Sequence, residues 1–198
     1  IGDYVLYTAC KQTKSWQDMG YIKIPVSVNF SMRQFQDTNL IAKVAEILDK
    51  SALPPEYLVM EITESMDGEK KSQIAIMLKE FNNLGAAIAV DDFGMQYSSL
   101  NRLKNMPFSK LKIDMQFIRG ITFNEKDRGV TRTIIQLAKN LDLMVVAEGV
   151  ETKEQLELLR EWGCDEVQGY YFYKPLSADE FEKILEREAL IQHSLAKN

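Results

Sequence analysis

Six short apolar runs, separated by segments with helical patterns, limit this chain to a narrow set of folds. They predict buried strands at residues 24–28, 57–60, 87–90, 110–113, 143–147 and 166–172. Strands that are hydrophobic along their whole length are typical of a parallel sheet whose faces are covered. The alternation of strand and helix therefore predicts a parallel α/β architecture, with right-handed crossover helices on the outer face.

The ends of several predicted helices are marked in the sequence. In three places Ser or Thr precedes Gln or Glu by three positions, so that both side chains can bond the free amides of a first turn: Ser31 with Gln34, Thr152 with Gln155, and Ser177 with Glu180. Gly85 and Gly163 are expected to end helices. A further helix is predicted at residues 130–140, after an exposed polar loop at 122–128.

The length of the chain favours one domain. At 198 residues and 45% hydrophobic content, it can bury one sizeable core but not two, so residues 1–198 are interpreted as a single domain. Ile1, Val5, Leu6 and Ala9 recur at helical spacing. We therefore expect the chain to open in an amphipathic helix and to be a piece of a longer protein.

Charge and cysteine content indicate the surroundings of the protein. A net charge of −5 and an isoelectric point near 5.1 argue against polymeric nucleic acid as a partner, because such binding depends on clustered Lys and Arg. Cys10 and Cys164 have no CxxC spacing, and we expect two small core thiols in a reducing cytoplasm. No apolar run approaches the length of a membrane span, so we expect no membrane contact by this segment.

The single histidine excludes several kinds of catalysis. His193 lies in a polar C-terminal segment. Nucleophile pairs of the Ser-His or Cys-His type, HExxH zinc sites and histidine-rich metal phosphodiesterases all need imidazoles at the site. Any hydrolytic chemistry must therefore depend on carboxylates, amides, lysine and a hard cation.

Polar side chains stand at the end of every predicted strand. In a parallel β/α barrel the loops after these ends form the active site. Any one such residue is explained better by the polarity of loops than by a function. The set is Asn29, Glu61, Asp91, Asp92, Lys112, Asp114, Glu148 and Gln168. Together they predict an oxygen-rich, negatively charged rim, which is costly unless hard divalent cations neutralise it. Because neighbouring strand residues point in different directions, Asp91 and Asp92 could serve two metals about 3.5–4 Å apart.

The segments VNFS, EITES, DDFG, YSSL, LKID, AEGVET, GCD and QGYYFYKP occur in this order, and over essentially the whole chain the sequence resembles the EAL domain family. The resemblance implies a modified TIM-type (β/α)8 barrel that hydrolyses cyclic di-GMP to pGpG with Mg²⁺ or Mn²⁺. It also implies a bacterial cytoplasmic signalling protein, frequent homodimers, and possible upstream GGDEF or sensory domains; the parent protein could be anchored in a membrane.

The resemblance also assigns roles by position. Asn29, Glu61 and Asp91 correspond to ligands of the first metal, Asp91 bridges to the second, and Asp92 and Glu148 complete the second site. The catalytic candidates are Lys112, which orients or activates the attacking water, Glu148, and Glu151 as a support. Gln168 and Asp114 are candidate substrate contacts, and Glu64 is similar to a glutamate that steadies the loop after Asp92.

Three residue groups keep a second interpretation. Lys112 could be an ion-pair partner rather than a catalytic group. The aromatic run at residues 170–173 could stack on guanine, but core packing is favoured. Met60, Met77 and Met144 are expected to fill the core.

Two departures from the family pattern oppose catalysis. The Glu-x-Leu segment that names the family and the strands around it are absent, so the barrel is expected to lack its first strands and one metal-binding carboxylate. In the family, the second residue after DDFG is usually Gly. In this chain the two residues after DDFG are Met95 and Gln96. A left-handed residue at position 96 would cost about 1 kcal/mol as Gln. These features leave open a degenerate domain that binds cyclic di-GMP or a protein partner without hydrolysis, and we expect weak or no activity from these residues alone.

The DFG triplet does not indicate a kinase, because no Gly-rich phosphate loop or HRD-like loop accompanies it.

Overall fold

A computed structural model describes residues 2–63, 71–94 and 100–195. Within these ranges six strands form one sheet, in which strand order follows chain order and every neighbouring pair is parallel. The strands are β1 (Val26–Phe30), β2 (Leu58–Thr63), β3 (Ala87–Phe93), β4 (Lys110–Ile113), β5 (Met144–Glu148) and β6 (Glu166–Gln168). All six predicted strands are present, and the parallel α/β class is confirmed.

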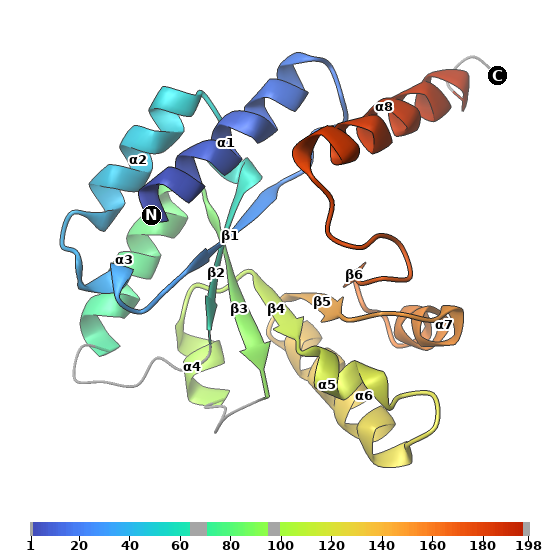
Figure 1. The fold of residues 1–198 in the computed structure, drawn as a ribbon. Coiled ribbons are helices and arrows are strands. Elements are labelled where there is room, and N and C mark those ends of the chain that lie inside the picture. The colour runs from blue at the N-terminus through green and yellow to red at the C-terminus, as the bar shows by residue number, and fades with distance from the viewer. Residues whose placement is uncertain (1, 64–70, 95–99, 196–198) are drawn as a thin grey trace.

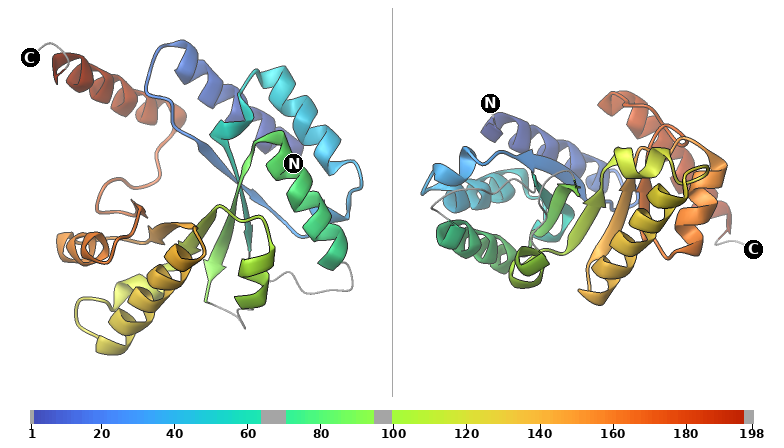
Figure 2. Two further views of the ribbon diagram at one scale, coloured as in Figure 1. Left: turned by 180° about the vertical axis from the view of Figure 1, so that it is seen from behind. Right: turned by 90° about the horizontal axis from the view of Figure 1, so that it is seen from below.

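Helices connect the strands and surround the sheet (Figure 1, Figure 2). In the described ranges they are α1 (Gly2–Asp18), α2 (Leu40–Ser51), α3 (Lys71–Leu84), α4 (Leu100–Asn105), α5 (Met115–Arg119), α6 (Glu125–Asn140), α7 (Lys153–Glu161) and α8 (Ala178–Leu195), with 3-10 turns η1 (Gln34–Gln36) and η2 (Pro55–Tyr57). Helices α1 to α3 lie beside the first strands and α5 to α7 beside the last. Among the described residues, no helix is long and apolar enough to cross a membrane.

Alternation along the strands separates an apolar face from a polar face. Side chains such as Met60, Ile62 and Ile113 are fully buried in the core between sheet and helices. Burial of an aliphatic side chain of this size stabilises the fold by about 1.5–3 kcal/mol. Their strand neighbours Glu61 and Lys112 point to the opposite face. The hydrophobic outer face thereby holds a set of polar groups on the inner face at fixed positions.

The marked helix ends agree with the structure in most cases. Thr152 and Gln155 form a complete capping box at α7. At α8 the Ser177 amide and hydroxyl donate to Glu180, whose own amide donates back to the Ser177 hydroxyl. Gly85 follows α3 in a left-handed conformation with φ 94°. Gly163, with φ 80°, ends the turn after α7.

Two predicted helix starts are wrong. The amides of Gln36 and Asp37 donate to the carbonyls of Arg33 and Gln34 at 3.2 and 3.0 Å, which makes the 3-10 turn η1, and α2 starts only at Leu40. Helix α6 begins earlier than residue 130, because the Asn124 side chain accepts the amides of residues 126 and 127. The exposed loop expected at 122–128 is correspondingly shorter.

The predicted last strand is too long. β6 ends at Gln168, and the chain turns at Gly169, where an added Cβ would lie 2.2 Å from the Val150 carbonyl oxygen. The Tyr171 amide then donates to that carbonyl at 2.9 Å. The aromatic run at 170–173 therefore leaves the sheet, and its side chains are exposed rather than packed in the core. Of the three methionines, Met60 and Met77 are buried as predicted, but Met144 is exposed at the start of β5.

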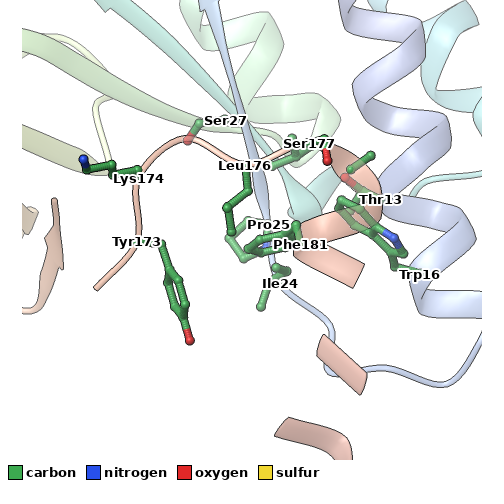
Figure 3. Close-up of a pocket in the computed structure, with 12 residues that line it drawn as sticks. Thr13, Trp16, Ile24, Pro25, Ser27, Tyr173, Lys174, Leu176, Ser177 and Phe181 are labelled. Atoms are coloured by element: carbon green, nitrogen blue, oxygen red, sulfur yellow. The ribbon is translucent and has the colours of Figure 1, made fainter. Parts of the chain in front are cut away.

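The C-terminal segment returns to the first helix. The Trp16 and Phe181 rings are 5.2 Å apart, and Trp16 Nε1 donates to Glu182 Oε2 at 3.0 Å. A pocket of about 480 Å³ lies beside this contact, with a mainly apolar lining that includes Ile24, Pro25 and Leu176 (Figure 3). This packing places α8 next to the β1 side of the sheet.

Both cysteines are free thiols. Cys10 is fully buried in α1, and Cys164 is half-buried with its Sγ near the Glu166 carbonyl. Burial raises the pKa of each thiol to about 11. These are the inert structural thiols predicted from the sequence.

Candidate metal centre

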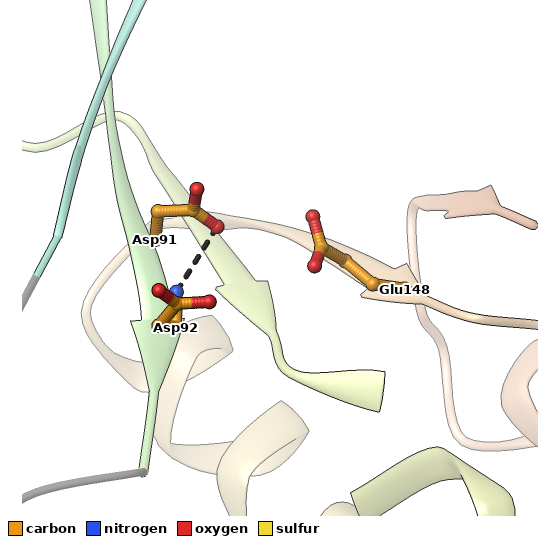
Figure 4. Close-up of side chains that lie close together, drawn as sticks. All are labelled: Asp91, Asp92 and Glu148. Atoms are coloured by element: carbon orange, nitrogen blue, oxygen red, sulfur yellow. Dashed lines mark hydrogen bonds between the residues drawn. The ribbon is translucent and has the colours of Figure 1, made fainter. Parts of the chain in front are cut away.

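Asp91 and Asp92 lie at a bulge near the end of β3. Val90 pairs with Leu111 and Phe93 with Ile113, so β3 carries one more residue than β4 between these two pairs. Asp92 has φ 54°, a left-handed conformation that Asp adopts more readily than most residues. Adjacent side chains of a regular strand point to opposite faces. The bulge instead brings both carboxylates to the same rim (Figure 4).

A third carboxylate reaches this rim from β5. Asp91, Asp92 and Glu148 each offer a carboxylate oxygen, and these oxygens all lie within 4.8 Å of one another. The Asp92 amide donates to Asp91 Oδ1 at 3.0 Å, which fixes the Asp91 side chain (Figure 4). Carboxylate oxygens are the ligands that Mg²⁺ and Mn²⁺ prefer, and here three carboxylates lie close together.

Lys112 lies in the middle of the acidic residues. Its side chain is 7% exposed, and Nζ forms ion pairs with Glu61 Oε2 at 2.8 Å, Asp91 Oδ1 at 3.1 Å and Glu148 Oε1 at 2.6 Å. The four residues come from β2, β3, β4 and β5, so each neighbouring strand contributes one group. Both interpretations of Lys112 therefore remain open, because an ion-pair partner and a catalytic group would occupy the same place.

The electrostatics reflect the crowding of negative charge. Burial lowers the pKa of Lys112, but hydrogen bonds from its ammonium to Glu148 and Glu61 outweigh that effect and hold the pKa above its ordinary value. Burial raises the pKa of Glu148, and Asp91 and Glu61 add to the rise against the opposing effect of Lys112. Burial and the neighbouring Asp91 likewise raise the pKa of Asp92. The four carboxylates outnumber the one ammonium, which is the condition under which added cations are favourable.

The other predicted site residues lie around this group. Asn29 is paired in register with Glu61, and Gln168 with Glu148, and both side chains are exposed. Asp114 accepts the Gln116 amide at 2.8 Å as the N-cap of α5, so one of its oxygens is already engaged. The Glu151 side chain is exposed in the loop after β5. Glu64, Met95 and Gln96 lie outside the described residues.

One residue of structural importance to the site is missing from the sequence-based set. Gln155 is 5% exposed and accepts the amide of Glu151, in the loop that follows Glu148. In the sequence, its spacing from Thr152 indicates only a helix start. One sequence signal points to Gln155. The predicted helix start lies directly after a strand that ends in the acidic residue Glu148.

A family model described as EAL domain matches residues 1–175. The chain belongs to the EAL domain family. Its fold is that of the EAL domain, a TIM-like barrel, and the described strands form an open, half-barrel sheet. The resemblance found in the sequence is thereby confirmed.

The relatives that this chain matches are much longer. Signaling protein YkoW of Bacillus subtilis is 41% identical over 185 residues, which are 93% of this chain and 23% of YkoW. The bifunctional diguanylate cyclase/cyclic di-GMP phosphodiesterase MucR of Pseudomonas aeruginosa is 37% identical over 180 residues, 91% of this chain and 26% of MucR. The EAL chain thus spans about a quarter of the length of these relatives.

Solved EAL structures superpose closely on it. The MucR phosphodiesterase in complex with c-di-GMP has a TM-score of 0.86 at 37% identity, covering 91% of this chain and 73% of that one. The EAL domain of Mycobacterium smegmatis DcpA has a TM-score of 0.90 at 34% identity, covering 94% of this chain and 84% of that one.

Proposed function

We propose that this EAL chain is the catalytic domain of a bacterial phosphodiesterase that hydrolyses cyclic di-GMP to linear pGpG. The observation that carries the proposal is the meeting of Glu61, Asp91 and Glu148 around Lys112, with Asp92 at the same rim. Groups from four neighbouring strands converge where barrel enzymes place their chemistry. The named activity of MucR and the c-di-GMP in the MucR structure support the choice of substrate.

The carboxylates would hold two divalent cations, Mg²⁺ or Mn²⁺. In this proposal Asn29, Glu61 and Asp91 hold the first and Asp91, Asp92 and Glu148 the second. The donor set fits, because hard oxygen ligands lie close together and carry excess negative charge. Bound there, the cations supply Lewis acidity and lower the pKa of a coordinated water.

The side chains of this chain have distinct parts in the reaction. Lys112 has three N–H donors, which now engage Glu61, Asp91 and Glu148. A buried ammonium held in this way orients its neighbours and can donate to an attacking water or a phosphate oxygen. Glu151, Gln168 and Asp114 border the same rim and are proposed to position the site and the substrate.

A substrate assay tests this function. The full-length protein is incubated with cyclic di-GMP and Mn²⁺ or Mg²⁺, and pGpG is followed by chromatography. We expect turnover that EDTA abolishes and that Asp91→Asn reduces by at least about 100-fold, because in this proposal Asp91 would hold both cations. Glu46→Gln, which removes an exposed carboxylate paired with Lys50 on α2, is the matched control and should leave turnover unchanged. Cyclic di-GMP that binds without turnover would contradict the enzyme and favour the degenerate binding domain.

We also propose that this domain acts beside other domains and as a homodimer in the bacterial cytoplasm. The length of YkoW and MucR relative to the matched region supports additional domains. Sedimentation equilibrium of the full-length protein with and without cyclic di-GMP tests the dimer. A monomer under both conditions would refute it.

A further inference from the structure

Gln155 links two parts of the rim that are distant in sequence. Its Oε1 accepts the amides of Glu151 at 2.8 Å and Thr152 at 3.0 Å, and its Nε2 donates to the Ile118 carbonyl at 3.2 Å. The side chain is 5% exposed. Buried amides whose donor and acceptor are both engaged hold their partners in a single arrangement.

Each partner leads to a group of the proposed metal centre. Glu151 follows Glu148 in the loop between β5 and α7. Ile118 belongs to α5, whose N-cap Asp114 follows the strand that carries Lys112. Gln155 therefore joins the loop after β5 to the segment after β4, on either side of the Lys112 and Glu148 ion pair.

The same loop is held from the β6 side as well. The Val150 amide donates to the Gln168 carbonyl at 3.1 Å, and the Tyr171 amide donates to the Val150 carbonyl at 2.9 Å. Gly149 has φ 70°, and a Cβ there would lie 2.5 Å from Met115 Cβ. Met115 belongs to α5, so this packing and the Gln155 bond to Ile118 both fix the loop relative to α5, and Gln155 is the contact that reaches Glu151.

We propose that Gln155 is a positioning residue of the metal centre, acting through the Glu151 backbone on the placement of Glu148 and Glu151. The part of this inference that concerns metal rests on the proposed function. A helix cap alone would not require the Ile118 contact, since capping involves only the first turn of α7. Groups that support metal ligands in this way typically contribute 10–100-fold to metal affinity.

Two substitutions separate positioning from capping. Gln155→Met keeps a similar length but removes all three side-chain hydrogen bonds. Thr152→Ala removes the hydroxyl that accepts the Gln155 amide at 3.2 Å, yet leaves the Gln155 contacts to Glu151 and Ile118 in place. Each variant loses one half of the capping box at the start of α7, so thermal stability should fall in both. A third variant, Gln155→Glu, keeps acceptor oxygens for the two amides, lacks the N–H donor to Ile118 and adds a negative charge at the same position.

The measurement is Mn²⁺ binding by the full-length protein, from the EPR signal of free Mn²⁺, with the thermal midpoint recorded for each variant. We expect the Mn²⁺ dissociation constant to rise about 10-fold in Gln155→Met, to rise by at least twofold in Gln155→Glu, and to stay within twofold in Thr152→Ala. In the hydrolysis assay the loss in Gln155→Met should be recovered at saturating Mn²⁺.

The outcomes distinguish this inference from the proposed function. If the folded Gln155 variants bind Mn²⁺ within twofold of the wild-type affinity, the positioning role is overturned. Gln155 would then serve only as part of the helix cap of α7. If Gln155→Met does not fold, the Gln155→Glu titration decides by the same criterion. Wild-type protein that binds Mn²⁺ but forms no pGpG would refute the proposed function, and the titrations would still decide this inference. Wild-type protein that binds no Mn²⁺ would overturn both.

Discussion

Removal of the Lys112 ammonium is the most direct perturbation of the metal centre. Lys112→Met leaves Glu61, Asp91 and Glu148 without their shared cation, at 10%, 12% and 16% side-chain exposure. Breaking a buried ion pair by deleting one partner costs about 3–5 kcal/mol. The variant can lower this cost by protonating one carboxylate. At pH 7, protonating a glutamate of ordinary pKa 4.5 costs about 3.4 kcal/mol.

The size of the effect therefore depends on pH. In the metal-free protein we expect Lys112→Met to lower the free energy of unfolding by about 3 kcal/mol at pH 7. At pH 5 the protonation that relieves it costs only about 0.7 kcal/mol, so the loss should fall to about 1 kcal/mol or less. Loss of the ammonium raises the folded-state pKa values of the carboxylates, so their cost to stability is absent below the unfolded-state pKa and grows as the pH rises from there through the folded-state pKa.

The assay is urea unfolding followed by circular dichroism in EDTA, at both pH values, and repeated with Mn²⁺. Lys110→Met is the matched control, because Lys110 lies two residues earlier on β4 and pairs with Glu166 at 2.7 Å, whose side chain is 42% exposed. An exposed partner stays hydrated, so the control should cost about 1 kcal/mol or less. Equal losses for the two variants, or a Lys112→Met loss that does not change between pH 5 and pH 7, would contradict a role for Lys112 in neutralising the three carboxylates.

Two further outcomes test the same cluster. Asp92 has a left-handed φ of 54°, a conformation that Asn adopts more easily than Ala. Asp92→Ala should therefore lower the free energy of unfolding by about 1 kcal/mol more than Asp92→Asn does. Equal urea midpoints for the two variants would contradict this. Burial raises the pKa of Glu148 in the folded protein, so its ionised form costs stability at neutral pH, and that cost disappears as the pH falls through the raised pKa toward 4.5. The stability of metal-free Glu148→Gln relative to wild type should therefore rise between pH 4 and pH 7 in urea titrations, and a fall would contradict the stated direction of the pKa shift.

The positions of the strands and the convergence of their polar ends could be predicted from the sequence. Apolar runs mark buried strands directly, and parallel strands must present their carboxyl ends at one edge of the sheet. The capping patterns at Thr152 and Ser177 were reliable because they depend only on local geometry. At Ser31 the same spacing produced a 3-10 turn, since the chain returns to extended backbone at Asp37.

What could not be predicted depends on contacts between distant segments. The aromatic run at 170–173 has the composition of a buried strand, but Gly169 packs on the Val150 backbone and turns the chain away from the sheet. The Gln155 contact with Ile118 joins residues 37 positions apart. No local pattern encodes such a link. The left-handed backbone at Asp92 follows from the pairing shift between β3 and β4, which is also a property of the assembled sheet.

These non-local features explain how one rim holds so many acids. A regular strand would turn either Asp91 or Asp92 into the hydrophobic outer face, where an unpaired carboxylate costs several kcal/mol. The bulge avoids that cost at the smaller expense of one left-handed residue, and Lys112 offsets part of the remaining repulsion. The cluster is still short of positive charge, so cations bound there would stabilise the folded chain as well as serve the proposed reaction. Stability without metal must then come from the core on the other face of the same strands, where Met60, Ile62 and Ile113 are fully buried.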